Sequence, residues 1–192
     1  DRLGFPVFPL KWKDPKSGEI SSGYRENGYF NESFINMLAF LGWNPGSAKE
    51  LYSIDELIND FTLERVGKSG AKFDPEKTKW FNQQHLRNKS NNELAVLMKE
   101  NLTYDVDISY LEGVAELMKE RAVFVHELLG DDYFFSSPDS FDEKTFRKKW
   151  KENTSSIMTE LKTVFETDDV FSIASIEANF KSFLEVNSLG MG

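Results

Sequence analysis

The residues best suited to chemistry are cations that gather between Asp60 and Ser90. Seven lysines and arginines lie in this stretch against four carboxylates. Such side chains bind the phosphate oxygens of nucleic acids, lysine as a point charge and arginine as a planar fork. The segment therefore suits a surface that follows a nucleic-acid backbone, although a solvated helix face would have the same composition.

A single arginine, Arg121, stands apart from that segment. It falls within a helix that the apolar spacing predicts from about Ile108 to Leu129. Its neighbours three and four residues away are apolar: Leu117, Met118, Phe124 and Val125. No ion pair within the helix therefore accounts for its charge. Either its stem covers the apolar stripe while its head reaches water, or its guanidinium binds a partner.

A second basic cluster spans Arg147–Lys151 and contains one aromatic residue, Trp150. We expect Trp150 to be buried, with the surrounding cations on a solvated helix face. A second contact to phosphate is the alternative interpretation.

The chain shows no convincing active site. It has no cysteine, and its only histidines, His85 and His126, have no second histidine at the spacing of a helical metal motif. Gly67–Ser69 resembles the end of a phosphate-binding loop, but Thr62 stands where that motif needs glycine. The residues thus favour a binding function.

The elements that position these side chains are predicted to be helices. Ser53 and Ser90 each precede a glutamate by three residues, which is the capping-box pattern. Asp74 precedes a proline, as at many helix starts. We expect Asn31 to cap the first helix and Gly42 to end it. The predicted helices span about 32–41, 53–61, 75–86, 90–98, 108–129, 141–151, 155–165 and 172–185.

The fold class is predicted to be mainly α, with a short N-terminal extended or β segment. Residues 1–23 are rich in proline and glycine and suit an extended segment or hairpin with a turn at Asp14–Gly18. A domain boundary is expected near 88–91. It separates residues 1–90, with net charge +1, from residues 91–192, with net charge -10.

Composition sets outer limits on the function. The net charge of -9 argues against nucleic-acid binding by the chain as a whole. Charges farther apart than ~10 Å are largely screened, however, so a local basic face can still bind phosphate. No apolar run approaches the ~20 residues that cross a bilayer, and the absence of cysteine fits a reducing compartment. We expect a cytoplasmic piece of a longer protein, without a membrane partner.

Four segments together resemble the region after the catalytic domain of bacterial glutamyl-tRNA synthetases: Tyr24–Tyr29, Glu32–Trp43, Phe61–Val66 and Phe73–Arg87. A weaker match continues to the end of the chain. The resemblance implies a stem-contact domain at 24–90 and a helical anticodon-binding domain at 91–192 that lacks its last helices. Residues 3–20 form a longer aromatic-rich insertion than most members carry, and they have no assigned role.

The resemblance also implies particular roles. Arg121 matches the arginine that reads the third anticodon base in glutamate-specific members, and Lys72, Lys77, Lys79 and Arg87 become candidates for contacts to the tRNA backbone. No catalytic or metal-binding residue and no cofactor is assigned to this chain. The parent enzyme would attach glutamate to tRNA(Glu) with ATP and Mg²⁺. We expect a monomer. The alternative is an acidic helical scaffold that binds proteins and no RNA.

Overall fold

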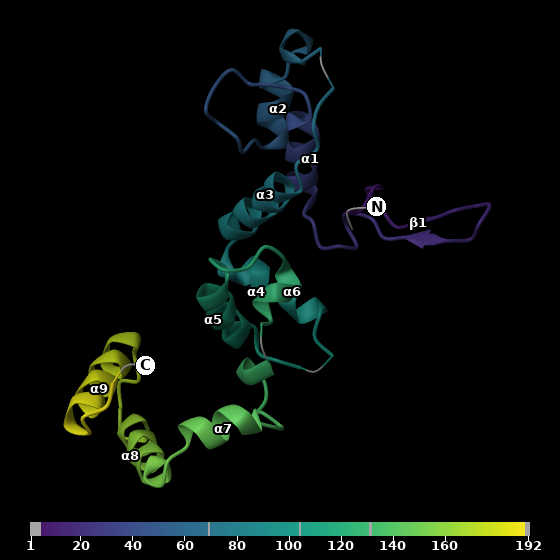
Figure 1. Ribbon diagram of the computed structural model, residues 1–192. Helices are drawn as coiled ribbons and strands as arrows, with labels where there is room; N and C mark the ends of the chain where they lie inside the picture. Colours follow the sequence, from purple (N-terminus) through teal and green to yellow (C-terminus); the bar gives the residue numbers. More distant parts are fainter. Residues whose placement is uncertain (1–4, 69, 104, 131, 191–192) are drawn as a thin grey trace. The chain divides into compact units, whose positions relative to one another are not determined.

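The structure is a computed structural model that describes residues 5–68, 70–103, 105–130 and 132–190. It divides into two compact units, residues 1–137 and 138–192. Figure 1 shows that helices dominate both units, and the predicted fold class is confirmed. Among the described residues, no helix is both long and apolar enough to cross a membrane.

The first unit begins with the predicted hairpin, in which β1 (Trp12–Lys13) pairs antiparallel with β2 (Ile20–Ser21). Its turn closes through a 2.9 Å hydrogen bond from the Gly18 amide to the Asp14 carbonyl. The Asp14 carboxylate also accepts a 2.6 Å bond from the Lys16 amide. Aspartate and glycine thus serve the turn because one accepts backbone bonds and the other adopts a φ of 76°.

Three helices and one 3₁₀ turn follow: α1 (Asn31–Phe40), α2 (Ile54–Asp60), η1 (Leu63–Arg65) and α3 (Pro75–Asn88). Ser53 and Asp74 cap α2 and α3 as predicted. Aromatic side chains dominate the buried cores around these helices. Their buried members are Tyr24, Tyr29, Met37, Phe81, Trp43, Tyr52 and Leu57.

The expected N-cap of α1 was wrong. Asn31 is the first residue of the helix, and Phe30 occupies the cap position without a side-chain cap. The Phe30 amide instead donates a 2.9 Å hydrogen bond to the Asn82 side chain on α3. A tertiary contact therefore replaces the local cap. Gly42 does follow the end of α1, with a φ of 123° that favours glycine.

The first unit continues with α4 (Asn91–Glu100), α5 (Ile108–Met118), α6 (Val125–Leu128) and a 3₁₀ turn, η2 (Asp132–Phe134). The capping box predicted at Ser90 opens α4. These helices share one apolar core with the end of α3. Its buried members are Leu86, Leu94, Ala95, Met98, Leu111, Val114, Ala115, Ala122 and Leu128.

The single long helix predicted for 108–129 was wrong. Helix α5 ends at Met118 and α6 begins at Val125, so Arg121 lies in the turn between them. The apolar spacing that suggested one helix is real, because Ala122 and Leu128 are both buried. The break has its cause in side chains from other parts of the chain, described below.

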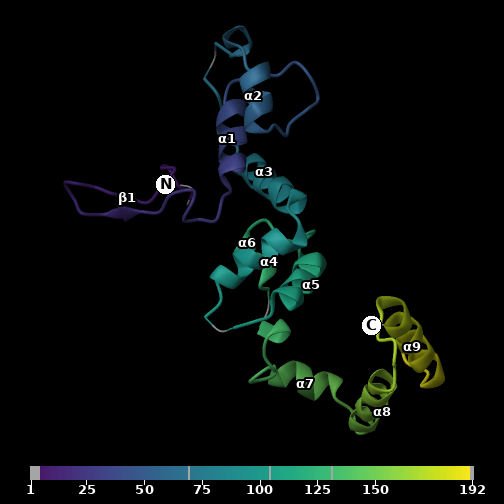
Figure 2. The same ribbon diagram turned by 180° about the vertical axis from the view of Figure 1, so that it is seen from behind.

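The second unit contains α7 (Glu143–Lys149), α8 (Thr154–Glu166) and α9 (Ile173–Val186). Helices α8 and α9 pack against each other, while α7 stands away from α9 in both views (Figures 1 and 2). The buried hydrophobic residues described in this unit are Phe183 and Leu184 of α9. The expected burial of Trp150 was wrong, because its ring packs on Phe146 of the same helical segment and in no core, and it is exposed.

Candidate nucleic-acid interface

The position of Arg121 depends on a buried amide on α3. The Asn82 side chain is fully buried. Its Nδ2 donates a 2.7 Å hydrogen bond to the Val123 carbonyl, and its Oδ1 accepts the 2.9 Å bond from the Phe30 amide. Because buried amides are costly when unpaired, these bonds fix α3 against both the start of α1 and the turn that holds Arg121.

A second side chain of α3 holds the same turn. Arg87 Nη2 donates a 2.5 Å hydrogen bond to the Glu120 carbonyl, and Arg87 Nε lies 3.2 Å from the Glu120 carboxylate. Lys119 adds a contact to the start of α4, with its Nζ 3.2 Å from Asn91 Oδ1. The two residues that precede Arg121 are therefore fixed by neighbouring helices.

The other side of the turn is capped by Glu127. Its carboxylate accepts hydrogen bonds from the Val123 amide at 2.6 Å and the Phe124 amide at 3.2 Å. In a continuous helix these amides would bond to carbonyls one turn earlier. The capture of both amides and carbonyls by side chains thus explains why α5 does not run on into α6.

The result is an exposed arginine on a firmly held turn. Arg121 is exposed, and its side chain has no ion pair with any residue that the structure describes. Its neighbour Glu120 is paired with Arg87 instead. The guanidinium of Arg121 is therefore accessible to a partner, and Arg87 and Arg121 are brought to the same part of the unit.

The other predicted contact residues differ in their surroundings. Lys72 is exposed, just before α3, and forms no ion pair among the described residues. Lys77 pairs with Glu50, and its Nζ lies 4.2 Å from the centre of the Trp80 ring. Among the described residues, Lys77 is therefore paired with a carboxylate and Lys72 is not.

Lys79 lies on another side of α3. Its Nζ is 3.1 Å from the Glu76 carboxylate and 5.6 Å from the centre of the Phe5 ring. Residues two apart on a helix point to different sides, so α3 does not bring Lys77 and Lys79 onto one face. The cations form separate points around α3, most of them paired with carboxylates. Exposed ion pairs of this kind contribute only ~0–1 kcal/mol, so a phosphate can compete for them.

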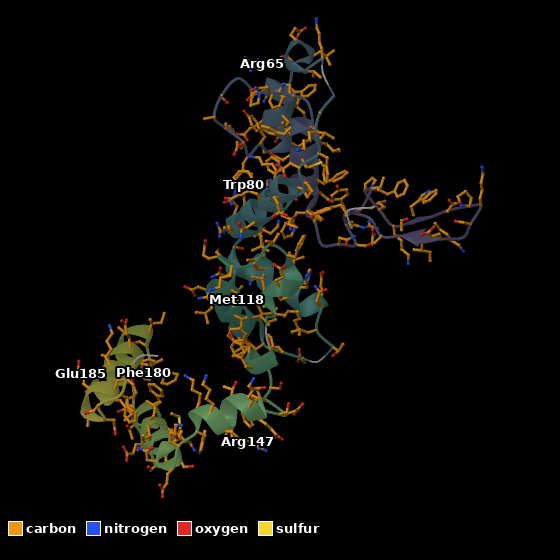
Figure 3. The ribbon with its side chains drawn as sticks, in the orientation of Figure 1. Arg65, Trp80, Met118, Arg147, Phe180 and Glu185 are labelled. Carbon is orange, nitrogen blue, oxygen red and sulfur yellow. The ribbon has the colours of Figure 1, made fainter. Side chains whose placement is uncertain are left out.

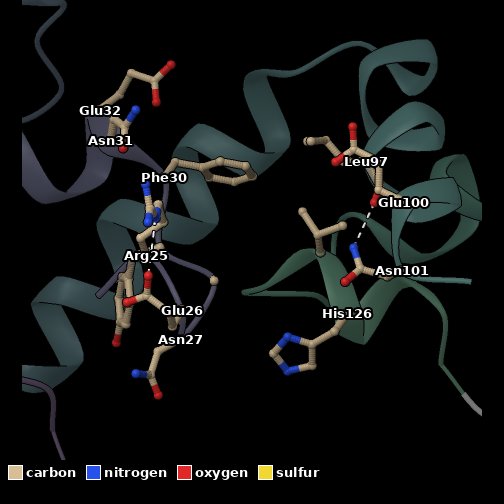
Figure 4. A pocket seen from close by; sticks show the side chains of 13 residues that line it. Arg25, Glu26, Asn27, Phe30, Asn31, Glu32, Leu97, Glu100, Asn101 and His126 are labelled. Atoms are coloured by element: carbon tan, nitrogen blue, oxygen red, sulfur yellow. Dashed lines mark hydrogen bonds and ion pairs between the residues drawn. The ribbon is translucent and has the colours of Figure 1, made fainter. Parts of the chain in front are cut away.

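A pocket of about 740 Å³ opens in the same unit, between the turn at residues 25–32 and the ends of α4 and α6 (Figure 4). Arg25 and His126 lie at its wall, but so do the carboxylates Glu26, Glu32 and Glu100. The excess of carboxylates makes the pocket unsuited to an anion. No group of side chains able to hold a metal ion occurs in the described part of the chain.

Sequence reasoning missed the residues that position Arg121. Asn82 lies within one of the segments that carried the family resemblance, directly after the buried Phe81. An amide on the apolar side of a helix signals a buried hydrogen-bond network. The roles of Arg87 and Glu120 toward each other carry no local signal, because 33 positions separate them.

A family comparison agrees with this geometry. Residues 86–192 match the family described as "Anticodon binding domain". The chain belongs to this family.

Named relatives refine the match. The chain is 46% identical over its whole length to the glutamate–tRNA ligase of Christiangramia forsetii, of which it covers 39%. It is 50% identical to that of Bacteroides fragilis, over 92% of the chain and 36% of the relative. The chain thus spans about two fifths of the length of these relatives, and the resemblance inferred from the sequence is confirmed.

Solved structures give the same result. A glutamate–tRNA ligase from Elizabethkingia meningosepticum, in complex with its amino acid, is 42% identical with a TM-score of 0.89. The glutamate–tRNA synthetase of Elizabethkingia anophelis is 40% identical with a TM-score of 0.85. This chain is covered completely in both, while 39% and 38% of those chains are covered. The alternative of a protein-binding scaffold is not favoured.

Proposed function

We propose that the chain is the tRNA-recognition portion of a glutamate–tRNA ligase and binds tRNA(Glu) through its stem and anticodon. The observation that carries this proposal is the exposed Arg121, on a turn whose carbonyls are bound by Arg87 and Asn82 of α3, in a chain that belongs to the anticodon-binding family. Joining of glutamate to tRNA, with ATP and Mg²⁺, takes place on other parts of the enzyme. We place the enzyme in the cytoplasm as a monomer.

The chemistry assigned to Arg121 is recognition of a base edge. A guanidinium fork can donate two hydrogen bonds to a base and discriminates against the wrong base by about 1–3 kcal/mol. The bases of an RNA loop are accessible for this because they are not paired. A firmly held turn favours discrimination, since a loosely held arginine could follow a wrong base to a second position.

The remaining cations contact the RNA backbone. We assign Arg87 and the lysines Lys72, Lys77 and Lys79 to phosphate binding, with the stem on residues 24–90 and the anticodon on residues 91–192. Arg87 has two functions in this proposal, because it also positions Glu120. Phosphate competes with Glu50 and Glu76 for two of the lysines.

Titration of the chain with a tRNA(Glu) transcript at several salt concentrations tests the proposal. The affinity should fall as salt rises, and removal of three phosphate contacts in K72A/K77A/K79A should reduce the slope of log K against log salt by about 3. The control is K99A/K162A/K181A, which removes three lysines that are also paired with carboxylates. Its slope should equal that of the unaltered chain.

Two results would contradict the proposal. One is the absence of tRNA binding at low salt, which would refute the recognition function. The other is ATP–pyrophosphate exchange by the purified chain, which would place the chemistry within these residues.

A further inference from the structure

Two exposed aromatic side chains, one in α7 and one directly after it, pack into none of the described cores. Every residue from 141 to 152 is exposed. The rings of Phe146 and Trp150 stack on each other, with their centres 4.9 Å apart and 23° between their planes. They nevertheless remain 45% and 42% exposed. Large aromatic residues usually contribute apolar area to a core or an interface, so this pair is available to a partner.

The positive charge of the second unit is concentrated in α7 and the two residues that follow it. Residues 138–192 contain seven lysines and arginines, and five of them lie between Lys144 and Lys151. The same unit contains ten carboxylates. A short basic surface therefore stands within an acidic unit, and it suits an anionic partner.

Helical spacing brings two of these cations next to the aromatic pair. Lys149 follows Phe146 by three residues and Arg147 precedes Trp150 by three. Figure 3 shows the side chain of Arg147 extending from this helix. Arg147 pairs with Glu143 at 3.1 Å, but both side chains are at least 80% exposed, so the pair is weak. Lys149 forms no ion pair among the described residues.

We propose that α7 is a separate RNA-contact surface, in which the Phe146–Trp150 pair stacks on an unpaired base and Arg147 and Lys149 bind the adjacent phosphates. Aromatic rings stack on any base, and flanking cations follow the backbone of a single strand. This inference rests on the proposed function, but it concerns a different unit from Arg121. Its stacked pair also distinguishes it from a surface that binds phosphate alone.

The cations are tested with the full 192-residue chain and the tRNA(Glu) transcript. The variant R147A/K149A should reduce the slope of log K against log salt by about 1.4. The control K144A/K148A removes the same number of positive charges from the other side of α7 and should leave the slope unchanged. A slope in the α7 variant equal to that of the control would overturn the proposal. An unaltered chain that does not bind tRNA would contradict the proposed function and this inference with it.

The aromatic pair is tested by three substitutions of Trp150. Loss of the ring in W150A should weaken binding roughly tenfold, and W150L should do the same because leucine is apolar but cannot stack. W150F keeps a ring and should restore most of the affinity. Circular dichroism should be the same for all three. Equal weakening in W150F and W150A, or none in either, would refute the stacking role. A protein partner that binds at α7 and is not displaced by tRNA would also contradict the proposal.

Discussion

The side chain of Asn82 donates a 2.7 Å hydrogen bond to the carbonyl of Val123, 41 positions later in the chain. This bond occupies a carbonyl that a continuous helix would use for the Glu127 amide. That amide bonds instead to the Phe124 carbonyl at 3.1 Å. The contact between α3 and the turn therefore helps decide where α5 ends, and with it where Arg121 lies.

Substitution of Asn82 should be strongly destabilising. In N82A the partly buried Phe30 amide and Val123 carbonyl lose the partner that the fully buried Asn82 side chain provides. An unpaired buried group costs ~1–3 kcal/mol, so we expect a loss of about 3 kcal/mol in the free energy of unfolding. Urea denaturation measures it. The control N88A removes an exposed amide on the same helix and should stay within about 0.5 kcal/mol of the parent. Equal effects of the two would refute the positioning role.

Gly23 should tolerate no side chain. A Cβ at this position would lie 2.2 Å from the Leu10 backbone, next to the 2.9 Å hydrogen bond from the Tyr24 amide to the Phe8 carbonyl. We expect G23A to separate the base of the hairpin from the turn that follows it. Faster hydrogen exchange at the Tyr24 amide would report this.

The matched control for G23A is G113A. Nothing lies within 4 Å of a Cβ at Gly113, which is in the interior of α5. Alanine stabilises an exposed helix position over glycine by about 0.5–1 kcal/mol. The two glycine-to-alanine substitutions should therefore shift the midpoint of thermal unfolding in opposite directions, upward for G113A and downward for G23A. Stabilisation by G23A would show that the hairpin base is not closely packed.

Stability should depend on His85 in mildly acidic solution. Burial lowers the pKa of His85 below its ordinary value of 6.5; the Lys89 cation adds to this and the Glu32 carboxylate opposes it. Between the folded-state pKa and 6.5 the unfolded chain binds more protons, so stability rises with pH and is lost as pH falls through this window. The free energy of unfolding of H85Q should therefore fall less than that of the parent between about pH 7.5 and pH 5. Parallel curves for H85Q and the parent would contradict the prediction.

Arg87 should not be replaceable by lysine. The guanidinium contacts both the carbonyl and the carboxylate of Glu120, whereas an ammonium has no planar fork. R87K keeps the charge toward RNA but should loosen the turn that precedes Arg121. We expect a small change in tRNA affinity and a larger loss of discrimination between anticodons, measured by competition binding. The opposite pattern would assign Arg87 to phosphate alone.

Local signals in the sequence predicted where most helices begin. Ser53, Asp74 and Ser90 all cap helices in the structure, because a capping residue and its partner lie within three positions of each other. The hairpin turn at Asp14–Gly18 was predictable for the same reason. These features depend on neighbours in the sequence, which the sequence displays directly.

Features that depend on distant contacts were not predictable in this way. The break between Met118 and Val125 arises from side chains at Asn82 and Arg87, which no helical periodicity reveals. The exposure of Trp150 depends on what the rest of its unit offers for packing. For the site, the residue types identified Arg121 as a charge without a partner in its predicted helix. Only the structure showed that Arg121 lies in a turn.

The central claim is tested most directly by the response of Arg121 to the third anticodon base. Two tRNA transcripts that differ only at this base should be bound with affinities that differ by about 5- to 150-fold, which corresponds to 1–3 kcal/mol. R121Q should reduce this ratio strongly while it leaves the unfolding transition unchanged, because Arg121 is exposed. An equal ratio for R121Q and the unaltered chain would contradict the account.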